Sequence, residues 1–224
     1  MVENKNLSSK WKPKDSEYTP GLTKEDWKDL LGDPSVYDED TQKMLMGIMA
    51  IGGIGTLEQV QEKERKSRTI DFDAQVSVFA KNVQQQTSCP NPPEEDGKPS
   101  WWAILFYRKA LSDGSFAWKV RDELREAFEE TGNSRGTTLY EIVIAIESLG
   151  GKGKLKDIYD AIEKRGKLPS LSTNGNWRLH INQTIQSFSN CYQESVTAYV
   201  NLSHPIFYSV SGLGAGEWGL EIYK

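Results

Sequence analysis

The chain has 224 residues, enough for one large domain or two small ones, and a formal net charge of −5 at pH 7. Its hydrophobic fraction of 37% and its seven tryptophans supply the apolar surface of packed cores, which excludes a wholly disordered chain. Its longest apolar runs fall far short of the roughly 20 residues that cross a bilayer. We therefore expect a folded, soluble protein with no membrane span, and the polar N-terminus, which lacks a signal-like apolar segment, favours the cytoplasm.

The acidic charge is unevenly distributed along the chain. From Thr137 to the end, Lys and Arg balance Asp and Glu, so the excess of acidic residues lies before this point. Because neutralisation of phosphates by Lys and Arg dominates non-specific DNA affinity, a net negative charge argues against a simple DNA binder. If the chain binds DNA, we expect its C-terminal half to face the duplex.

The N-terminal half begins with a polar arm and continues as helices followed by a hairpin. Residues 1–20 lack periodicity and are rich in Lys, Ser, Asn and Pro, which is typical of a flexible arm. Thr23, followed by Asp26, resembles a capping box that begins a helix, and Gly32-Asp33-Pro34 ends it. The other predicted elements are helices at 44–51, 57–66, 73–86 and 121–130, a loop at 89–100, and hairpin strands at 104–108 and 116–120.

The same order of elements begins again after a predicted linker at residues 131–136. On its third helix, Leu179 is expected on the apolar side together with Ile181, Ile185 and Phe188. The predicted elements are helices at 139–149, 155–162 and 177–190, a loop at 169–175, and hairpin strands at 206–210 and 218–222 around Gly212, Gly214 and Gly216.

An internal repeat relates the two halves. Ile51-Gly-Gly-Ile-Gly-Thr-Leu57 matches Leu149-Gly-Gly-Lys-Gly-Lys-Leu155 in its apolar residues and in its three glycines, and the hairpin residues around Trp118 match those around Trp218, all at an offset of about 100 residues. Each unit reads helix, Gly-rich turn, helix, loop, helix and hairpin, which is the order of a winged helix. We therefore predict a mainly α fold with small β hairpins (α+β), made of tandem winged-helix (helix-turn-helix) repeats. The predicted domains are the arm at 1–20, an N-terminal winged-helix-like domain at 21–132 and a C-terminal winged-helix domain at 137–224.

Motifs in both halves carry a resemblance to a known group of proteins. Tyr18-Thr-Pro-Gly-Leu-Thr-Lys-Glu-Asp-Trp27, with Ala50-Ile-Gly-Gly53, Thr87-Ser-Cys-Pro90 and residues 102–118, is similar to the N-terminal region of bacterial modification-dependent restriction proteins of the McrB and HNH-nuclease type. The stretch from Leu149-Gly-Gly to Gly216-Glu-Trp-Gly-Leu220 resembles the winged-helix modules appended to such proteins. The resemblance implies DNA recognition in a restriction or defence system. The ATPase, GTPase or nuclease domain usually fused to these modules has no counterpart, and no phosphate-binding loop ending in Gly-Lys-Ser/Thr is present.

If DNA is bound, the side chains that read base edges should lie on the exposed faces of the third helices. Asn and Gln suit adenine edges, whereas Arg and Lys suit guanine. The C-terminal candidates are Asn176, Trp177, Arg178, Asn182, Gln183, Gln186 and Asn190, and the N-terminal candidates are Gln75, Ser77, Lys81, Asn82, Gln85 and Gln86. Lys152, Lys154 and Lys156 in the Gly-rich turn are candidates for phosphate contacts. The alternative interpretation is that these polar side chains only solvate their faces.

Trp118 and Trp218 could stack on a flipped base, but packing of each hairpin against its core is the better interpretation. Trp101 and Trp102 are less constrained, and a modified-base pocket would need an aromatic cage that a sequence cannot reveal.

Catalytic interpretations are weaker. Cys191 and His180 could imitate a nucleophile and its base, but a cysteine at a helix end usually serves packing. The acidic residues Glu62, Glu64, Asp71 and Asp73, with Lys63, could imitate a metal-dependent nuclease cluster, yet their helical context lacks the strand that usually presents such carboxylates. We predict no catalytic residue, no metal site and no cofactor.

The sequence thus favours a non-catalytic protein that recognises double-stranded DNA, by its sequence or by base modification, in a bacterial restriction or defence system. Cleavage would belong to a nuclease or NTPase partner subunit. Three alternatives stay open: a winged-helix transcriptional regulator, a protein–protein interaction module, and a small metal-dependent nuclease.

Overall fold

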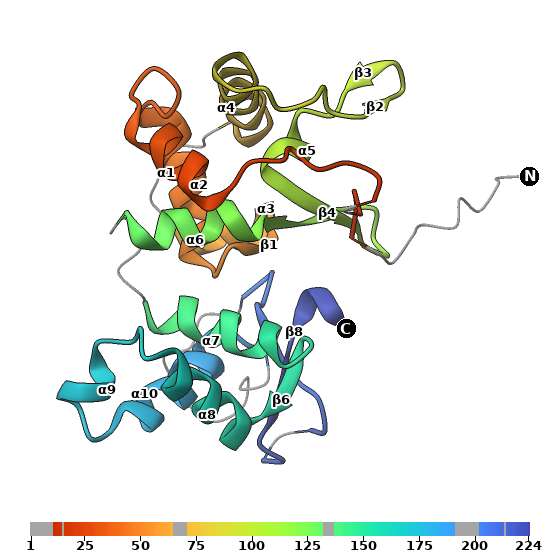
Figure 1. The fold of residues 1–224 in the computed structure, drawn as a ribbon. Helices are drawn as coiled ribbons and strands as arrows, with labels where there is room; N and C mark the ends of the chain where they lie inside the picture. The colour runs from red at the N-terminus through yellow and green to blue at the C-terminus, as the bar shows by residue number, and fades with distance from the viewer. Residues whose placement is uncertain (1–10, 15, 65–70, 132–136, 191–201, 213) are drawn as a thin grey trace, which may run out of the picture. The chain divides into compact units, whose positions relative to one another are not determined.

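The computed structural model describes residues 11–14, 16–64, 71–131, 137–190, 202–212 and 214–224 (Figure 1). They form helices and small antiparallel sheets in two compact units. Unit 1 comprises residues 1–49 and 66–134, and unit 2 comprises residues 50–65 and 135–224. Unit 2 therefore includes a segment that the sequence assigned to the N-terminal domain. Nearly all of the predicted linker and residues 1–10 and 15 of the predicted arm lie outside the described residues. The prediction of a flexible arm is wrong for its described part, because Lys12 pairs with Arg108 through two backbone hydrogen bonds and the buried Tyr18 donates to the Pro90 carbonyl oxygen.

The helices of unit 1 follow the predicted caps and apolar stripes closely. Thr23 accepts a hydrogen bond from the Asp26 backbone N–H, and the Asp26 carboxylate accepts one from Thr23, which confirms the capping box. Trp27 is fully buried and contacts Phe79 edge to face. The helices are α1 (Lys24–Gly32), α2 (Glu39–Ala50), α4 (Phe72–Gln86), α5 (Trp102–Leu105) and α6 (Asp122–Glu130), and α1 packs against α6.

The predicted hairpin of unit 1 is present, with one corrected boundary. Its strands β4 (Phe106–Ala110) and β5 (Phe116–Val120) pair antiparallel, with Phe106 opposite Val120. The first strand does not begin at Ile104, because residues 102–105 form the buried turn of helix α5, whose apolar run resembles a strand in sequence. The predicted loop at 89–100 contains a short ribbon of β2 (Glu94–Glu95) and β3 (Lys98–Pro99).

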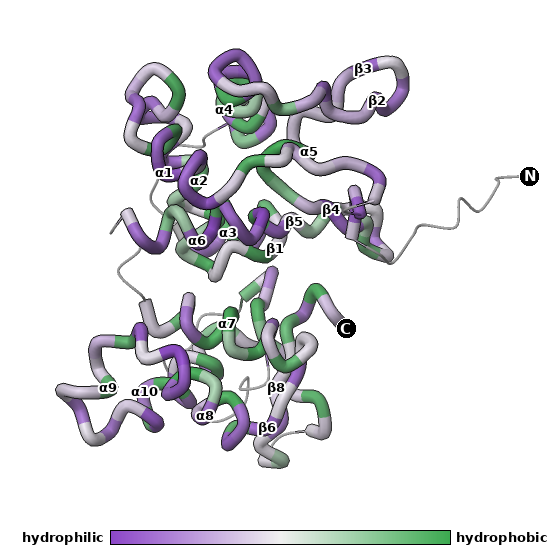
Figure 2. Tube along the Cα trace, viewed as in Figure 1, coloured by the Kyte–Doolittle hydropathy of each residue, from purple (hydrophilic) through white to green (hydrophobic). Residues whose placement is uncertain are grey.

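Unit 2 is built around helix α7 (Thr138–Ser148), which is apolar along most of its length (Figure 2). Every residue from Leu139 to Ile146 is buried, as expected of a helix that is covered on all sides. Helix α7 packs against α8, α10 and strand β8. The other elements are β1 (Ile54–Thr56), α3 (Leu57–Glu64), β6 (Lys152–Lys154), α8 (Leu155–Arg165), α9 (Ser170–Thr173), α10 (Trp177–Ser187), β7 (Phe207–Ser209), β8 (Glu217–Leu220) and the 3-10 helix η1 (Glu221–Tyr223).

The sheet of unit 2 has three strands in the order β6-β8-β7, all antiparallel. Trp218 of the central strand lies opposite Gly153 of β6 and Ser209 of β7. The sequence predicted the hairpin of β7 and β8 but not β6, because a strand of three residues alternating Lys and Gly carries no apolar pattern.

The segment at residues 50–65 covers part of α7. Gly52 has a φ of +95°, and a Cβ atom built on it would lie 2.5 Å from Cβ of Val143. Only glycine allows the backbone to approach the helix this closely. Helix α3 adds polar contacts, because the Glu62 carboxylate accepts hydrogen bonds from the backbone N–H groups of Ser203 (2.9 Å) and His204 (2.8 Å).

Three further predictions for unit 2 need correction. The loop at 169–175 contains the short helix α9, and α10 ends at Ser187, so Asn190 lies beyond the helix. Leu179 is 54% exposed and does not belong to the apolar side of α10. The physical reason is that α10 buries only one narrow stripe, formed by Trp177, Ile181 and Ile185.

The element order repeats along the chain. The order α2, β1, α3, α4, β4, β5 is matched by α7, β6, α8, α10, β7, β8. The first series has β2, β3 and α5 in addition, and the second has α9. Both Gly-Gly pairs, Gly52-Gly53 and Gly150-Gly151, have positive φ angles. The turn from α2 to β1 and the turn from α7 to β6 therefore use the same left-handed backbone conformation. Among the described residues, no helix is long and apolar enough to span a membrane.

Candidate nucleic-acid interface

Helix α10 has one buried face and one exposed face. Trp177, Ile181 and Ile185 recur at four-residue spacing and pack towards α7. Leu179 and Gln183 are exposed and lie on the opposite side, since two residues along an α-helix correspond to a rotation of about 200°. The face of α10 that is free to meet a ligand is therefore the one that carries the predicted amide side chains.

The amide candidates differ in availability. Gln183 and Asn176 are exposed, whereas Asn182 and Gln186 are half-buried beside them. Asn176 is the N-cap residue of α10 and its side chain makes no capping hydrogen bond. Asn190 is exposed but lies past the end of the helix, so it does not belong to this face.

The start of α10 is held by aromatic and ionic contacts. Trp177 is buried and lies edge-on to Tyr159, with ring centroids 5.6 Å apart, so its ring is not presented at the surface. The Arg178 guanidinium lies 4.7 Å from the Trp177 ring centroid and 3.0 Å from Glu163 Oε1. An ion pair this exposed contributes about 0–1 kcal/mol, so Arg178 can exchange Glu163 for another anion at little cost.

The stretch from 164 to 193 contains no Asp or Glu, although the chain as a whole carries a net charge of −5. It does contain Lys164, Arg165, Lys167 and Arg178. Its described part forms the end of α8, helix α9 and all of α10. The sequence already shows that this stretch has no Asp or Glu. A count of charges over the whole C-terminal half does not reveal it, because acidic residues elsewhere in that half balance the Lys and Arg residues.

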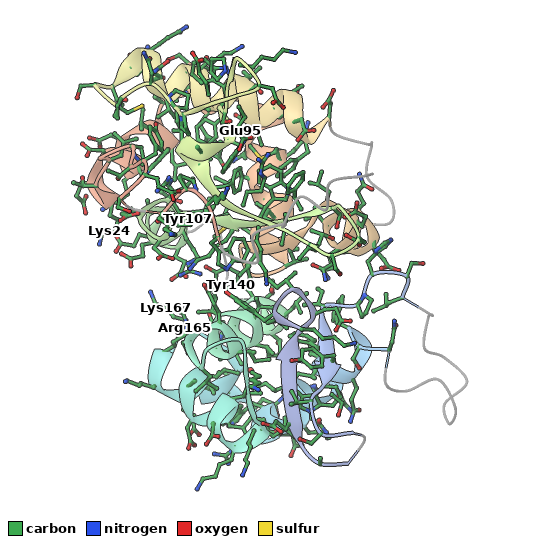
Figure 3. All side chains as sticks on the ribbon, turned by 90° about the vertical axis from the view of Figure 1, so that its right-hand side faces the viewer. Lys24, Glu95, Tyr107, Tyr140, Arg165 and Lys167 are labelled. Carbon is green, nitrogen blue, oxygen red and sulfur yellow. The ribbon has the colours of Figure 1, made fainter. Side chains whose placement is uncertain are left out.

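Apart from Lys63, whose Nζ lies 5.2 Å from the Phe188 ring centroid, five lysines of unit 2 have exposed side chains with no carboxylate partner among the described residues. Lys152 and Lys154 lie on the same face of β6, because Gly153 separates them in an extended strand. The other three are Lys156, Lys164 and Lys167, the last of which is labelled in Figure 3.

Some cations of unit 2 are already paired, and the surface of α8 also carries acidic residues. Arg165, also labelled in Figure 3, binds the buried Glu141 carboxylate at 2.8 Å, so it is used inside the fold. The exposed surface of α8 also carries Asp157, Asp160 and Glu163, so its middle is not basic. The unpaired positive charge of this unit therefore lies on β6 and at the two ends of α8, where Lys156 and Lys164 stand next to Asp157 and Glu163.

Helix α4 of unit 1 presents a weaker candidate surface. The Asn82 side chain donates to the Val36 carbonyl oxygen at 3.4 Å, and Lys81 Nζ lies 5.5 Å from the Trp101 ring centroid. Both side chains therefore have partners within unit 1. The exposed or half-buried candidates Gln75, Ser77 and Gln85, together with the terminal Gln86, share the helix with Asp73 in its first turn.

The hairpin tryptophans serve packing. Trp118 is 6% exposed and contacts the rings of Phe72 and Phe106, and Trp218 is also 6% exposed. Their burial confirms the packing interpretation over base stacking.

An aromatic cage does occur in unit 1, but it is filled. The Arg108 guanidinium lies 4.3 Å from the ring centroids of both Trp102 and Phe116. The Glu95 carboxylate binds the same guanidinium at 2.6 and 2.9 Å. Because Arg108 occupies the space between the two rings, this cage offers no room for a base.

Two of the carboxylates that could imitate a metal site, Glu62 and Asp71, have structural roles. Glu62 caps the turn at residues 203–204, and the Asp71 side chain accepts the Ala74 N–H at the start of α4. No cluster of three or more metal-binding side chains occurs among the described residues. Cys191 lies outside them, so its proximity to His180 is not described.

Sequence reasoning identified α10 and its amides but missed two features of the same surface. Lys164 and Lys167 extend the basic region, and the absence of acid around them was the signal that could have found them. The exposed Leu179 could be recognised only once the buried stripe of α10 was known. No protein-family model, no curated protein and no solved structure matches this chain.

Proposed function

We propose that the chain binds double-stranded DNA through unit 2 and that α10 is the helix that enters the major groove. In a winged helix the third helix lies in this groove, whereas the hairpin flanks the backbone. Helix α10 holds the corresponding place in the series α7, α8, α10, β7, β8, and its polar face points away from the core. Tandem winged helices are the architecture we propose for the two repeats.

The observation that carries this proposal is the acid-free stretch at 164–193. A chain with a net charge of −5 is repelled by phosphates unless the carboxylates are kept away from the contact surface. Helix α10 carries no carboxylate of its own, and the Glu163 carboxylate of α8, which lies 3.0 Å from the Arg178 guanidinium, is already paired with that cation. Amide side chains on α10 can then accept and donate hydrogen bonds at adenine edges.

The unpaired lysines supply the phosphate contacts in this arrangement. Lys152 and Lys154 on β6 and Lys156 in the first turn of α8 lie beside the hairpin. Lys164 lies in the last turn of α8, and Lys167 follows two residues after the helix ends. Each phosphate neutralised releases counterions, so log K should fall with log salt by about 0.9 per contact. Five contacts correspond to a slope of about −4.5.

We infer that recognition and chemistry are divided between different chains or domains. Glu62 and Asp71 cap a turn and a helix, and the resemblance to restriction modules suggests a nuclease or NTPase partner in a bacterial defence system. The defence setting is supported by that resemblance alone.

Fluorescence anisotropy with a labelled duplex over a salt series tests DNA binding. The wild type should bind saturably, and Lys152→Gln/Lys154→Gln should reduce the salt slope by about 2. Lys43→Gln is the matched control, because Lys43 is an exposed lysine of unit 1 that already pairs with Glu39 and Asp40. Equal losses in both variants, or no saturable binding by the wild type at low salt, would refute the proposal.

A protein-interaction module is the second candidate, favoured by the net charge of −5. It predicts no duplex affinity at any salt concentration.

A further inference from the structure

Helix α3, which belongs to the first repeat in sequence, makes its polar contacts with the second. The segment at 50–65 is part of unit 2, although unit 1 precedes and follows it in the chain. The side chains of α3 contact Phe188 and the turn at residues 203–205, which lies just before strand β7. The helix is therefore placed to act on the hairpin of the second repeat.

Gln59 links the start of α3 to this turn. It is 5% exposed, and its side-chain oxygen accepts the Thr56 backbone N–H at 2.9 Å while the Thr56 hydroxyl accepts the Gln59 N–H at 3.3 Å. These two hydrogen bonds form a capping box, in which Glu would serve as well as Gln. The Nε2 amide, which Glu lacks, donates to the Pro205 carbonyl oxygen at 2.6 Å. Gln59 therefore fixes the turn in addition to capping the helix.

Glu62 and Lys63 hold the same region from the next turn of α3. The Glu62 carboxylate accepts the backbone N–H groups of residues 203 and 204, and Lys63 Nζ lies 5.2 Å from the Phe188 ring centroid. The Phe188 carbonyl oxygen in turn accepts the N–H groups of residues 206 and 207 at 2.9 and 3.0 Å. These contacts together define where β7 begins.

The sheet connects this fixed end to the lysines that are proposed to contact phosphates. Strand β7 pairs with β8, and β8 pairs with β6, where Lys152 lies opposite Gly219 and Lys154 lies opposite Glu217. Backbone pairing holds neighbouring strands at a set spacing of about 4.8 Å. The position of β7 therefore sets the positions of β8 and of the β6 lysines.

We propose that Gln59 and Glu62 are positioning residues for DNA binding, because they hold the hairpin and the β6 lysines where the sheet meets the phosphate backbone. The proposal rests on the DNA-binding function stated above. Both side chains act through the hairpin and touch no DNA themselves. The first repeat thereby contributes a helix to the binding unit of the second.

The charge of Glu62 gives this role a test of sign. If only its negative charge mattered, its removal should strengthen binding to a polyanion. If Glu62 positions the hairpin, its removal should weaken binding, because fewer molecules have the hairpin in place. Glu58 is the matched control, since it lies on the same helix, is also half-buried and takes no part in the contacts with residues 203–205.

Fluorescence anisotropy with a labelled duplex at fixed salt measures the variants. Glu62→Ala should raise Kd by about three- to tenfold. Glu62→Gln keeps one acceptor oxygen and should raise it less, whereas Glu58→Ala should leave Kd unchanged or lower it. Gln59→Met removes the donor to Pro205 without changing the net charge and should also weaken binding. Thermal unfolding verifies that each variant is folded at the assay temperature.

The outcomes separate this inference from the function on which it rests. Unchanged or tighter binding by folded Glu62→Ala or Gln59→Met overturns the inference while DNA binding itself stands. Equal weakening by Glu58→Ala overturns it as well, because the contacts with residues 203–205 are then not the cause. The absence of saturable binding by the wild type overturns the proposed function and this inference with it.

Discussion

Replacing Gly52 with alanine tests how closely the segment at 50–65 packs on helix α7. The new Cβ would lie 2.5 Å from Cβ of Val143, a residue with no exposed surface, so one of the two backbones must move. Overpacking of this kind costs about 1–3 kcal/mol. The positive φ of +95° adds about 1–2 kcal/mol for a residue with a side chain. We expect Gly52→Ala to lower the free energy of unfolding by about 2–5 kcal/mol.

The second repeat offers a matched control. Gly150 occupies the position equivalent to Gly52 and has a similar φ of +85°, but a Cβ there would meet nothing within 4 Å. Gly150→Ala should therefore cost only the conformational part, about 1–2 kcal/mol. Urea and thermal unfolding measure both variants, with a change of about 2–4 °C in Tm for each kcal/mol in a chain of this length. Equal destabilisation of the two variants would refute the close packing of residue 52 on α7.

Two further predictions concern polar contacts. Glu62→Ala removes the acceptor of two backbone N–H groups at residues 203–204. The free energy of unfolding should fall by only about 1–2 kcal/mol, because both hydrogen bonds are exposed to solvent. Urea unfolding measures this loss, and a loss no larger than that of the neighbouring Glu58→Ala would contradict the prediction. The hydrogen bonds from Thr23 hold the pKa of Asp26 below its usual value of 3.8. Because the folded-state pKa is the lower one, this stabilisation is complete above pH 3.8 and is lost as the pH falls through the depressed value. Acid unfolding followed by circular dichroism should show that Asp26→Asn removes this part of the pH dependence, and an unchanged profile would count against the cap.

The local elements could be predicted because their causes are local. The box formed by Thr23 and Asp26 acts within one helical turn, and the stripe of α4 is set by residues three and four positions apart. The predicted start of strand β4 was wrong because its cause is not local. The run at 102–105 is fully apolar after its tryptophan, and only its burial within unit 1 selects a helical turn over a strand.

The candidate interface was predicted in part. The amides of α10 were identified from their residue types, but the sequence placed Leu179 on the buried side because leucine is apolar. Trp177 was expected at the surface and is buried against Tyr159. Which apolar residue of a short helix is buried depends on what packs against it, and this is not encoded in the spacing of that helix alone.

The sequence by itself determined the repeat, the order of helices and hairpins, and the acid-free stretch at 164–193, since these depend on residue type, spacing and charge along the chain. The tertiary structure decided which lysines lack a carboxylate partner, which face of α10 is exposed, and that residues 50–65 belong with the C-terminal unit. Burial and ion pairing depend on contacts between segments far apart in sequence, such as Glu62 with residues 203–204 or Glu141 with Arg165. Such contacts form only when the chain is folded.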